Sequence, residues 1–378
     1  TSIIHTIDSG ETFPHIGQGF LARPILIEGD AGTGKTVVAT TLFYYLKTHP
    51  KYKSLKIGLV YSNTAMRNVI QQVFAHTPGL RKTDVIAPID VTKHHYDIII
   101  CDEAQRLRQA KNIGRYIVHF KKGNERLHLD NSHDELDWLL LNAGRLILFY
   151  DPKQIVCPSD ISQTKFDGRL KDRKRGIRPV ELKEQMRIHA GSQYVPYIYD
   201  ILFQRNNISK KFVNYDFKLF SSFQDMWNAL EEKEAAVKLC RFCSGYGWPW
   251  VSKEDSKKPD IQLEGREIWW NRQTDGWLQN PEAKLEMGSI YSLAGLDINY
   301  AAVIIGPDLI YDIKDQKIKV NRQNYFDNKV KQGVTDEELT AFLLKTYAVL
   351  MTRGILGTYV YTCDQNLFRY LQRFIPTA

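Results

Sequence analysis

Residues 24–36 read Pro24-Ile25-Leu26-Ile27-Glu28-Gly29-Asp30-Ala31-Gly32-Thr33-Gly34-Lys35-Thr36. An apolar strand thus runs into the spacing GxxxxGKT, and a helical pattern continues from there to Leu46. In this context the glycines let backbone N–H groups curl around phosphate oxygens, and the helix N-terminus adds partial positive charge. The stretch therefore predicts an α/β domain with a phosphate-binding loop for a nucleoside triphosphate.

Each polar position of this loop has an expected role. We expect Lys35 to reach the β- and γ-phosphates of ATP and Thr36 to ligate Mg²⁺. The expected nucleotide-binding residues of the loop are Gly29, Ala31, Gly32, Thr33, Gly34, Lys35 and Thr36.

Two further predicted strands end in polar residues. The strand from Tyr96 to Cys101 leads into Asp102-Glu103-Ala104-Gln105. Since ligands bind at the carboxyl ends of parallel strands, we expect Asp102 to hold the Mg²⁺ shell and Glu103 to polarise the attacking water. The strand from Arg145 to Tyr150 leads into Asp151-Pro152-Lys153-Gln154. Asp151 and Gln154 are candidates to sense the γ-phosphate, although this motif alone also fits an ordinary Asp-Pro turn.

Apolar runs alternate with amphipathic segments in the first half of the chain, with a strand at 56–61 and a helix at 64–76 between those above. This alternation predicts a parallel sheet covered on both faces by helices. In the second half we expect helices at 192–203, 336–350 and 365–374 and a strand at 358–362.

Composition narrows the class of protein. The 378 residues are 43% hydrophobic and 25% charged, as in ordinary globular proteins, and no run of eighteen apolar residues could span a membrane. The N-terminus lacks the layout of a signal peptide, and five scattered cysteines favour a reducing, cytoplasmic setting. Cys240 and Cys243 form a lone CxxC without further ligands, which fits half of an apolar strand better than a zinc site.

The formal charge of +8 fits an anionic partner, and its distribution is more informative. One basic stretch runs from Arg106 to Arg126 and another from Lys165 to Arg178. Either stretch alone reads as a solvated loop. Because each follows a candidate catalytic strand, the pair favours contact with a phosphate backbone, and we expect such contacts from Arg173, Lys174 and Arg175.

The order of the loop, DEAQ and DPKQ resembles superfamily 1 helicases. A narrower resemblance, to a prokaryotic P-loop family related to the helicase-like domain of Schlafen proteins, covers nearly the whole chain. The matching stretches are ELKEQMR at 181–187, SGYGWPW at 244–250, WN at 270–271, GLDINY at 295–300, VIIGPDL at 303–309, YAVLMTRG at 347–354 and GTYVY at 357–361. The resemblance implies two tandem RecA-like domains: lobe one at 1–164, a basic linker at 165–178 and lobe two at 179–378.

The resemblance also implies roles for single residues. Arg187 and Arg353 occupy the places of two arginines that reach the γ-phosphate in superfamily 1 motors. Ser62, Asn63 and Thr64 occupy the place of the first nucleic-acid contact, Gln18 that of an adenine contact, and Gly295 with Asp297 a nucleotide-binding motif. That motif departs from the family pattern, because Ala294 replaces a glutamine and Asp297 a glutamate.

Two functions of different class remain open. The first is an ATP- and Mg²⁺-dependent motor, a helicase or translocase on single-stranded DNA or RNA, favoured by Glu103 and both arginines. The second is an NTP-binding regulatory or scaffold module, favoured by the Ala294 departure. A nuclease is weaker, since the sequence shows no second carboxylate cluster, although the resemblance allows a nuclease or other effector as a partner and a role in phage defence.

Five of the seven tryptophans lie between residues 240 and 280. Aromatic rings can stack on unpaired bases or pack a core. For Trp248, Trp250 and Trp270 we expect core positions, and for Trp269 and Trp277 both interpretations stay open.

Overall fold

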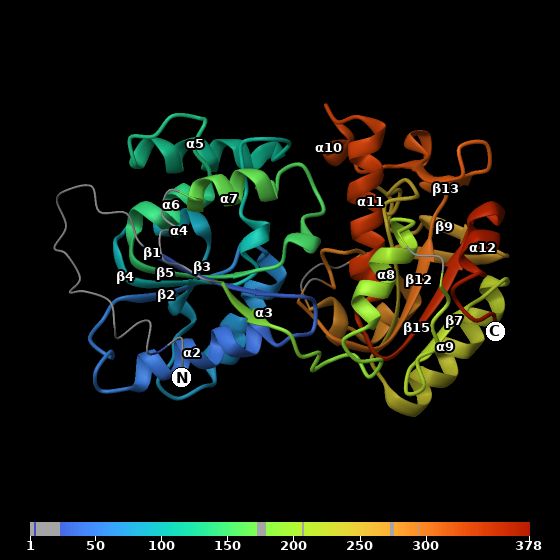
Figure 1. Ribbon diagram of the computed structural model, residues 1–378, viewed down its shortest axis with the longest axis horizontal. Helices are drawn as coiled ribbons and strands as arrows, with labels where there is room; N and C mark the ends of the chain where they lie inside the picture. The colour runs from blue at the N-terminus through green and yellow to red at the C-terminus, as the bar shows by residue number, and fades with distance from the viewer. Residues whose placement is uncertain (1–3, 5–22, 172–178, 206–207, 273–275, 294) are drawn as a thin grey trace. The chain divides into compact units, whose positions relative to one another are not determined.

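The computed structural model describes residues 4, 23–171, 179–205, 208–272, 276–293 and 295–378 (Figure 1). The chain divides into two compact units: unit 1 is Thr1–Gly29 with Gly34–Leu182, and unit 2 is Asp30–Thr33 with Lys183–Ala378. Within the described ranges, no helix combines the length and apolar character needed to cross a membrane. Both units are α/β with mainly parallel sheets, which confirms the predicted fold class.

Unit 1 contains one six-stranded sheet in the order β3-β2-β4-β5-β1-β6, and every pairing in it is parallel. Its strands are β1 (Arg23–Gly29), β2 (Ile57–Val60), β3 (Val85–Ile86), β4 (Tyr96–Cys101), β5 (Ala143–Tyr150) and β6 (Val180–Leu182). Its helices are α2 (Lys35–Thr48), α3 (Thr64–Ala75), α4 (Pro88–Val91), α5 (Ile117–Arg126), α6 (Glu135–Asn142) and α7 (Gln163–Lys171).

Helices cover both faces of the unit 1 sheet (Figure 1). On one face, α2 and α3 bury Phe43 and Ile70 against Ile98 and Ile100 of β4. On the other face, α4 to α7 pack against the alternate strand residues, such as Ile99. The central strands are buried on both sides, which explains why they read as continuous apolar runs in the sequence.

Unit 2 contains a seven-stranded sheet in the order β7-β15-β12-β8-β11-β10-β9, parallel except for the pair β9 and β10. Its strands are β7 (Asp216–Leu219), β8 (Cys240–Ser244), β9 (Ile261–Leu263), β10 (Arg266–Trp270), β11 (Glu286–Gly288), β12 (Ile298–Ile305) and β15 (Gly354–Thr362), and an antiparallel hairpin is formed by β13 (Leu309–Asp312) and β14 (Lys317–Val320). Its helices are α8 (Tyr194–Leu202), α9 (Phe223–Val237), α10 (Asn328–Lys331), α11 (Asp336–Met351) and α12 (Gln365–Leu371).

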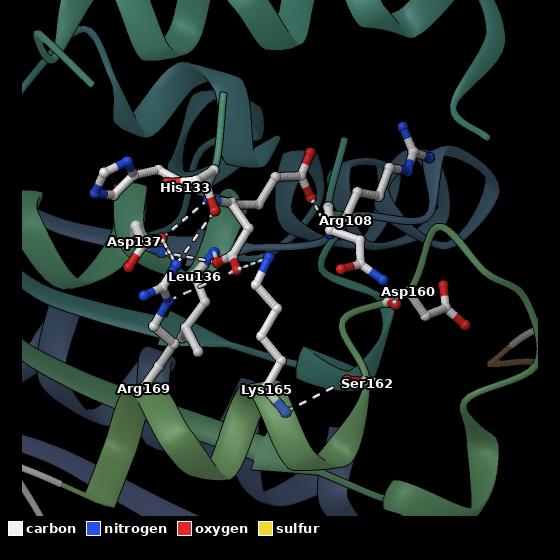
Figure 2. A network of polar contacts seen from close by, with 12 residues as sticks. Arg108, His133, Leu136, Asp137, Asp160, Ser162, Lys165 and Arg169 are labelled. Atoms are coloured by element: carbon white, nitrogen blue, oxygen red, sulfur yellow. Dashed lines mark hydrogen bonds and ion pairs between the residues drawn. The ribbon is translucent and has the colours of Figure 1, made fainter. Parts of the chain in front are cut away.

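The predicted linker is wrong over Lys165–Lys171, which form most of α7 in unit 1. Two forces hold this helix on the unit. Phe166 is fully buried and stacks on Tyr150 with ring centroids 4.1 Å apart. Lys165 Nζ lies 3.1 Å from Asp134 Oδ2, and Arg169 pairs with acids of the same segment (Figure 2). The boundary between the units follows Leu182, and residues 172–178 lie outside the described residues.

The tryptophan-rich segment is partly core. Trp270 is 5% exposed, and Trp277 is 1% exposed with its indole N–H donating to Glu286. Trp248 and Trp269 are half-buried. The core prediction is wrong for Trp250, which is 37% exposed, because it follows Pro249 in the loop beyond β8 rather than facing the sheet.

The cysteine pair Cys240 and Cys243 lies on β8, and both thiols are free and buried. Burial raises the pKa of the Cys240 thiol to about 12 and also raises the pKa of the Cys243 thiol. In the described part of the chain no group of three or more His, Cys, Asp or Glu side chains could hold a metal ion. The burial of both side chains on β8 agrees with the expected place in an apolar strand.

The GYGW and GPD motifs meet at the carboxyl ends of β8 and β12. Asp308 is fully buried there, and its Oδ1 accepts a hydrogen bond of 2.7 Å from the Tyr347 hydroxyl. A Cβ on Gly245 would lie 2.6 Å from that hydroxyl and 2.8 Å from Asp308 Oδ2, so the glycine makes room for both. Burial raises the pKa of the Asp308 carboxyl to about 7, although the bond from Tyr347 opposes the rise.

This pKa predicts a pH-dependent stability difference between wild type and Asp308→Asn. The folded state holds the proton more tightly than the unfolded state, so wild-type stability falls as pH rises from about 4 to about 7 and then levels off. Asp308→Asn removes that loss. The free energy of unfolding of the variant minus that of wild type should therefore be about 2 kcal/mol or more higher at pH 8 than at pH 5. Urea unfolding followed by tryptophan fluorescence measures this, since six of the seven tryptophans lie in unit 2. A constant difference between the two proteins at both pH values would contradict it.

Candidate nucleotide site

The phosphate-binding loop has the backbone that its glycines predict. Gly32 and Gly34 adopt φ values of +83° and +84°, in the left-handed region that favours glycine. Strand β1 ends at Gly29 and α2 begins at Lys35, so the loop joins a strand end to a helix N-terminus. The Lys35 ammonium is buried and donates to the Gly29 carbonyl at 2.6 Å.

Asp102 lies fully buried at the end of β4. Burial, followed by the charge of Glu103, raises the pKa of its carboxyl to about 6, while Thr36 and Lys35 lower it. Its Oδ1 accepts the Glu103 N–H at 3.0 Å, and its Oδ2 has no hydrogen-bond partner among the described residues. A buried carboxylate oxygen of this kind is costly without a donor or cation.

These residues fit a magnesium ion. Mg²⁺ is usually held by one or two protein oxygens together with substrate phosphates and water, so a three-carboxylate cage is not required. The Asp102 carboxylate and the Thr36 hydroxyl are the oxygen donors of this set, at the loop that would hold the phosphates.

Glu103 follows directly in a left-handed conformation, with φ of +53°. Such a backbone is strained for a non-glycine residue and is common at functional sites. The Gln105 side-chain NH2 donates to the Glu103 carboxylate, and the Gln105 side-chain oxygen, Oε1, accepts the Asp151 N–H at 3.1 Å. Gln105 is fully buried, so it fixes the loop after β4 against the loop after β5.

Asp151 is the centre of this network. Its Oδ2 lies 3.6 Å from Lys35 Nζ and accepts a hydrogen bond of 2.8 Å from the Gln154 amide. Both carboxylate and amide are buried. The structure therefore brings together Lys35, Glu103 and Gln154, three residues that the sequence predicted from three separate motifs.

Gln105 was missed by the sequence-based prediction of site residues. It is the last residue of the DEAQ motif, and its position beside Glu103 was the available signal. Its two-sided bonding could not be read from the sequence, because it depends on the adjacency of β4 and β5.

In unit 2, the two predicted arginines lie at the amino ends of β12 and β15. Arg187 Nη1 lies 2.8 Å from Asp297 Oδ1, and its Nη2 donates to the Thr352 carbonyl at 2.8 Å. Arg353 is next to Thr352, only 4% exposed, between the end of α11 and the start of β15. Gly295, with φ of +77°, precedes Asp297 on the same edge.

Gln185 was also missed. Its amide donates to the Ala31 carbonyl at 2.8 Å, and its oxygen accepts the N–H of Arg187 at 3.0 Å. A Cβ on Gly32 would come within 2.0 Å of that oxygen, so the Gln185 side chain occupies the space that glycine leaves. Its place two residues before Arg187 in ELKEQMR was the only sequence signal.

Of the residues expected to contact nucleic acid, three lie at the start of α3. Ser62 is buried, and Asn63 caps α3 by accepting the Met66 N–H at 3.1 Å. Thr64 begins α3 and accepts a bond from Arg67. The remaining predicted residues, Gln18, Arg173, Lys174 and Arg175, lie outside the described residues.

The chain is similar to one known protein by sequence and to two solved structures by their alignment. An uncharacterized protein of Saccharomyces cerevisiae is 26% identical over 92% of this chain and 83% of its own length. Among solved structures, Mss116p bound to ssRNA and AMP-PNP aligns with 12% identity and a TM-score of 0.41, over 92% of this chain and 68% of that one. The arterivirus nonstructural protein 10 helicase aligns with 12% identity and a TM-score of 0.38, over 93% of this chain and 62% of that one.

The family comparison covers most of the chain. The profile described as Schlafen group 3, DNA/RNA helicase domain, matches residues 23–364. This range contains the phosphate-binding loop, the DEAQ and DPKQ motifs and both arginines. The chain belongs to the Schlafen group 3 DNA/RNA helicase domain family.

Proposed function

We propose that the chain is an ATP-dependent nucleic-acid motor, a helicase or a translocase on single-stranded DNA or RNA. The observation that carries the proposal is the network in unit 1 that joins Lys35, Asp151, Gln105 and Glu103 at the ends of β1, β5 and β4. The family, whose description names a DNA/RNA helicase domain, supports the nucleic-acid part.

In this proposal Lys35 binds the β- and γ-phosphates, and Thr36 with Asp102 holds Mg²⁺. When bound, Mg²⁺ neutralises charge on the phosphates. Glu103 accepts a proton from the attacking water, and Gln105 keeps its carboxylate oriented through the amide hydrogen bond. Gln154 senses the γ-phosphate together with Asp151, which accepts a hydrogen bond from the Gln154 amide.

Unit 2 supplies the positive charge for the transition state. Arg353 and Arg187 are proposed to act on the γ-phosphate, with Asp297 holding the Arg187 guanidinium in place. Gly295 shapes the nucleotide-facing turn, and Gln18 contacts adenine. A polynucleotide strand is proposed to contact Ser62, Asn63, Thr64, Arg173, Lys174 and Arg175.

The wider setting belongs to the same proposal. We place the protein in the cytoplasm, acting with a nuclease or other effector as a separate subunit or domain, in defence against phage. Testing for co-purification of a nuclease activity addresses this part separately from ATP turnover.

A second candidate is an NTP-binding switch that changes conformation without translocating. One contact favours it: the Arg187 guanidinium is already engaged by Asp297 and by the Thr352 carbonyl. The ATP hydrolysis rate with and without single-stranded DNA or RNA separates the two. A motor hydrolyses ATP faster with the strand present, whereas a switch binds ATP with a rate that does not respond to the strand.

Glu103→Gln is expected to lower the ATP hydrolysis rate by about a hundredfold or more, because the amide keeps the shape but cannot accept the proton. The affinity for Mg²⁺ and ATP should stay close to that of wild type. Turnover assays and binding of a fluorescent ATP analogue measure the two quantities. Equal loss of binding and turnover would instead make Glu103 a structural residue or a metal ligand.

A further inference from the structure

The two basic stretches of unit 1 differ in what their charges contact. In the described part of the second stretch, Lys165 lies 3.1 Å from Asp134 and Arg169 lies 3.3 Å from Asp137, so acids of the same unit neutralise both (Figure 2). The first stretch, from Arg106 to Arg126, holds seven Lys and Arg residues and a single acid, Glu125. Its charges therefore have few acids nearby in the sequence.

Burial divides this first stretch into an inner and an outer group. Arg106 is buried, with its guanidinium 3.4 Å from Asp160, and Arg108 stacks on the Tyr116 ring at 4.6 Å. The outer group is exposed and forms what we call the α5 basic face: Lys111, Arg115, Lys121, Lys122 and Arg126. Neither Lys121 nor Lys122 forms an ion pair with a residue that the structure describes.

The fold fixes the orientation of this face. Phe120 is fully buried against Trp138, with ring centroids 5.0 Å apart, and the Trp138 indole N–H donates to Asn124 at 2.6 Å. A Cβ on Gly123 would lie 2.6 Å from the Trp138 ring, so α5 lies very close to α6 on this side. Lys121 and Lys122 consequently point away from the unit, together with the exposed His119.

A polar network beneath this face connects it with the candidate site. The buried Glu135 accepts the Tyr116 hydroxyl at 2.8 Å and the Arg108 N–H at 2.8 Å. The backbone of Arg108 pairs with that of Asp160 in an isolated antiparallel β-bridge, with the two residues side by side in Figure 2, and the Ile161 N–H donates to the Leu107 carbonyl. The loop that follows Glu103 is thus joined to the loop that follows Gln154, and Glu135 links the first of these loops to Tyr116 of η3 (Gly114–Tyr116), which leads into α5.

We propose that the α5 basic face binds the phosphate backbone of a polynucleotide. The inference rests on the proposed function and adds a contact separate from Ser62–Thr64. Those residues lead into α3, which packs on one face of the sheet, whereas α5 belongs to the helices on the other face. Closely spaced lysines and arginines with one acid among them complement a regular row of phosphates, and each phosphate contact releases counterions.

The test compares Lys121→Glu/Lys122→Glu with Lys53→Glu/Lys82→Glu in the full chain. The control pair removes the same charge from exposed lysines elsewhere in unit 1. Binding of a fluorescent single-stranded oligonucleotide is measured by anisotropy across a range of KCl concentrations. The α5 pair should bind about tenfold more weakly or worse, with a salt slope smaller by about 1.4 for two lost contacts, and the control pair should match wild type.

ATP hydrolysis without polynucleotide should be unchanged in both variants, which also shows that they are folded. Wild-type affinity and salt slope in the α5 pair, or an equal loss in the control pair, would overturn the inference. If the wild type binds the oligonucleotide through α5 but does not hydrolyse ATP, the proposed function falls and the α5 contact stands. If the wild type does not bind, both fall.

Discussion

Lys35→Ala is expected to abolish ATP hydrolysis and to weaken nucleotide binding, while the chain remains folded. The Lys35 ammonium is the positive charge at the phosphate-binding loop, where it donates to the Gly29 carbonyl and lies 3.6 Å from Asp151. In the proposed mechanism, the charge that develops on the γ-phosphate then lacks the lysine of the loop. Release of phosphate measures turnover, and circular dichroism shows whether the protein is folded.

Two further variants serve as controls for the charge and for the helix. Lys35→Met removes the charge but keeps the length of the stem, so it tests the charge even if the alanine variant is unstable. Lys47 lies on the same helix and pairs with Asp84 at 3.3 Å, and Lys47→Ala should hydrolyse ATP at close to the wild-type rate. Hydrolysis at the wild-type rate in folded Lys35→Ala would remove the basis for the nucleotide site.

The sequence predicted the elements that carry the site, because strong local patterns define them. The apolar run before Gly29 became β1, and the helix predicted from Lys35 became α2. The same holds for β4, whose predicted bounds, Tyr96 to Cys101, agree with the structure. Buried parallel strands read as continuous apolar runs, so they can be located from sequence with little ambiguity.

The contacts between motifs could not be predicted in the same way. The bond from Gln105 to the Asp151 N–H depends on β4 pairing with β5, which are far apart in the chain. The lysines and arginines of residues 165–178 predict a linker, although residues 165–171 belong to α7. Its two buried apolar residues, Phe166 and Leu170, are spaced as one face of a helix, and its charges pair with Asp134 and Asp137, which are distant in the sequence.

Polar side chains at helix starts also have a local role that sequence motifs do not reveal. Asn63 was expected to contact nucleic acid, and its side chain caps α3. A cap of this kind contributes about 1 kcal/mol to stability, so a loss of binding in an Asn63 variant needs a stability control.

Arg353→Ala is expected to lower the ATP hydrolysis rate by about a thousandfold or more, with a much smaller change in nucleotide affinity. An arginine that stabilises charge developing during phosphoryl transfer matters more to the transition state than to the bound substrate. Arg353 directly precedes β15, just after α11, and is next to Thr352, whose carbonyl accepts a hydrogen bond from Arg187. Steady-state turnover and the affinity for a fluorescent ATP analogue measure the two effects.

Arg353 is only 4% exposed, and its charge lowers the pKa of the buried Cys243 thiol, so a structural role must be tested separately with controls. Arg322 is the matched structural arginine of unit 2, bonded to Asp336 and to the Val334 carbonyl, and Arg322→Ala should lower the melting temperature while leaving turnover of the folded fraction near wild type. Arg353→Lys should not restore full activity, since an ammonium lacks the planar fork of the guanidinium. If Arg353→Ala instead behaves as Arg322→Ala does, with lower stability and normal turnover, then Arg353 is structural. The proposed hydrolysis would then have to rely on Lys35 and Arg187 for its positive charge.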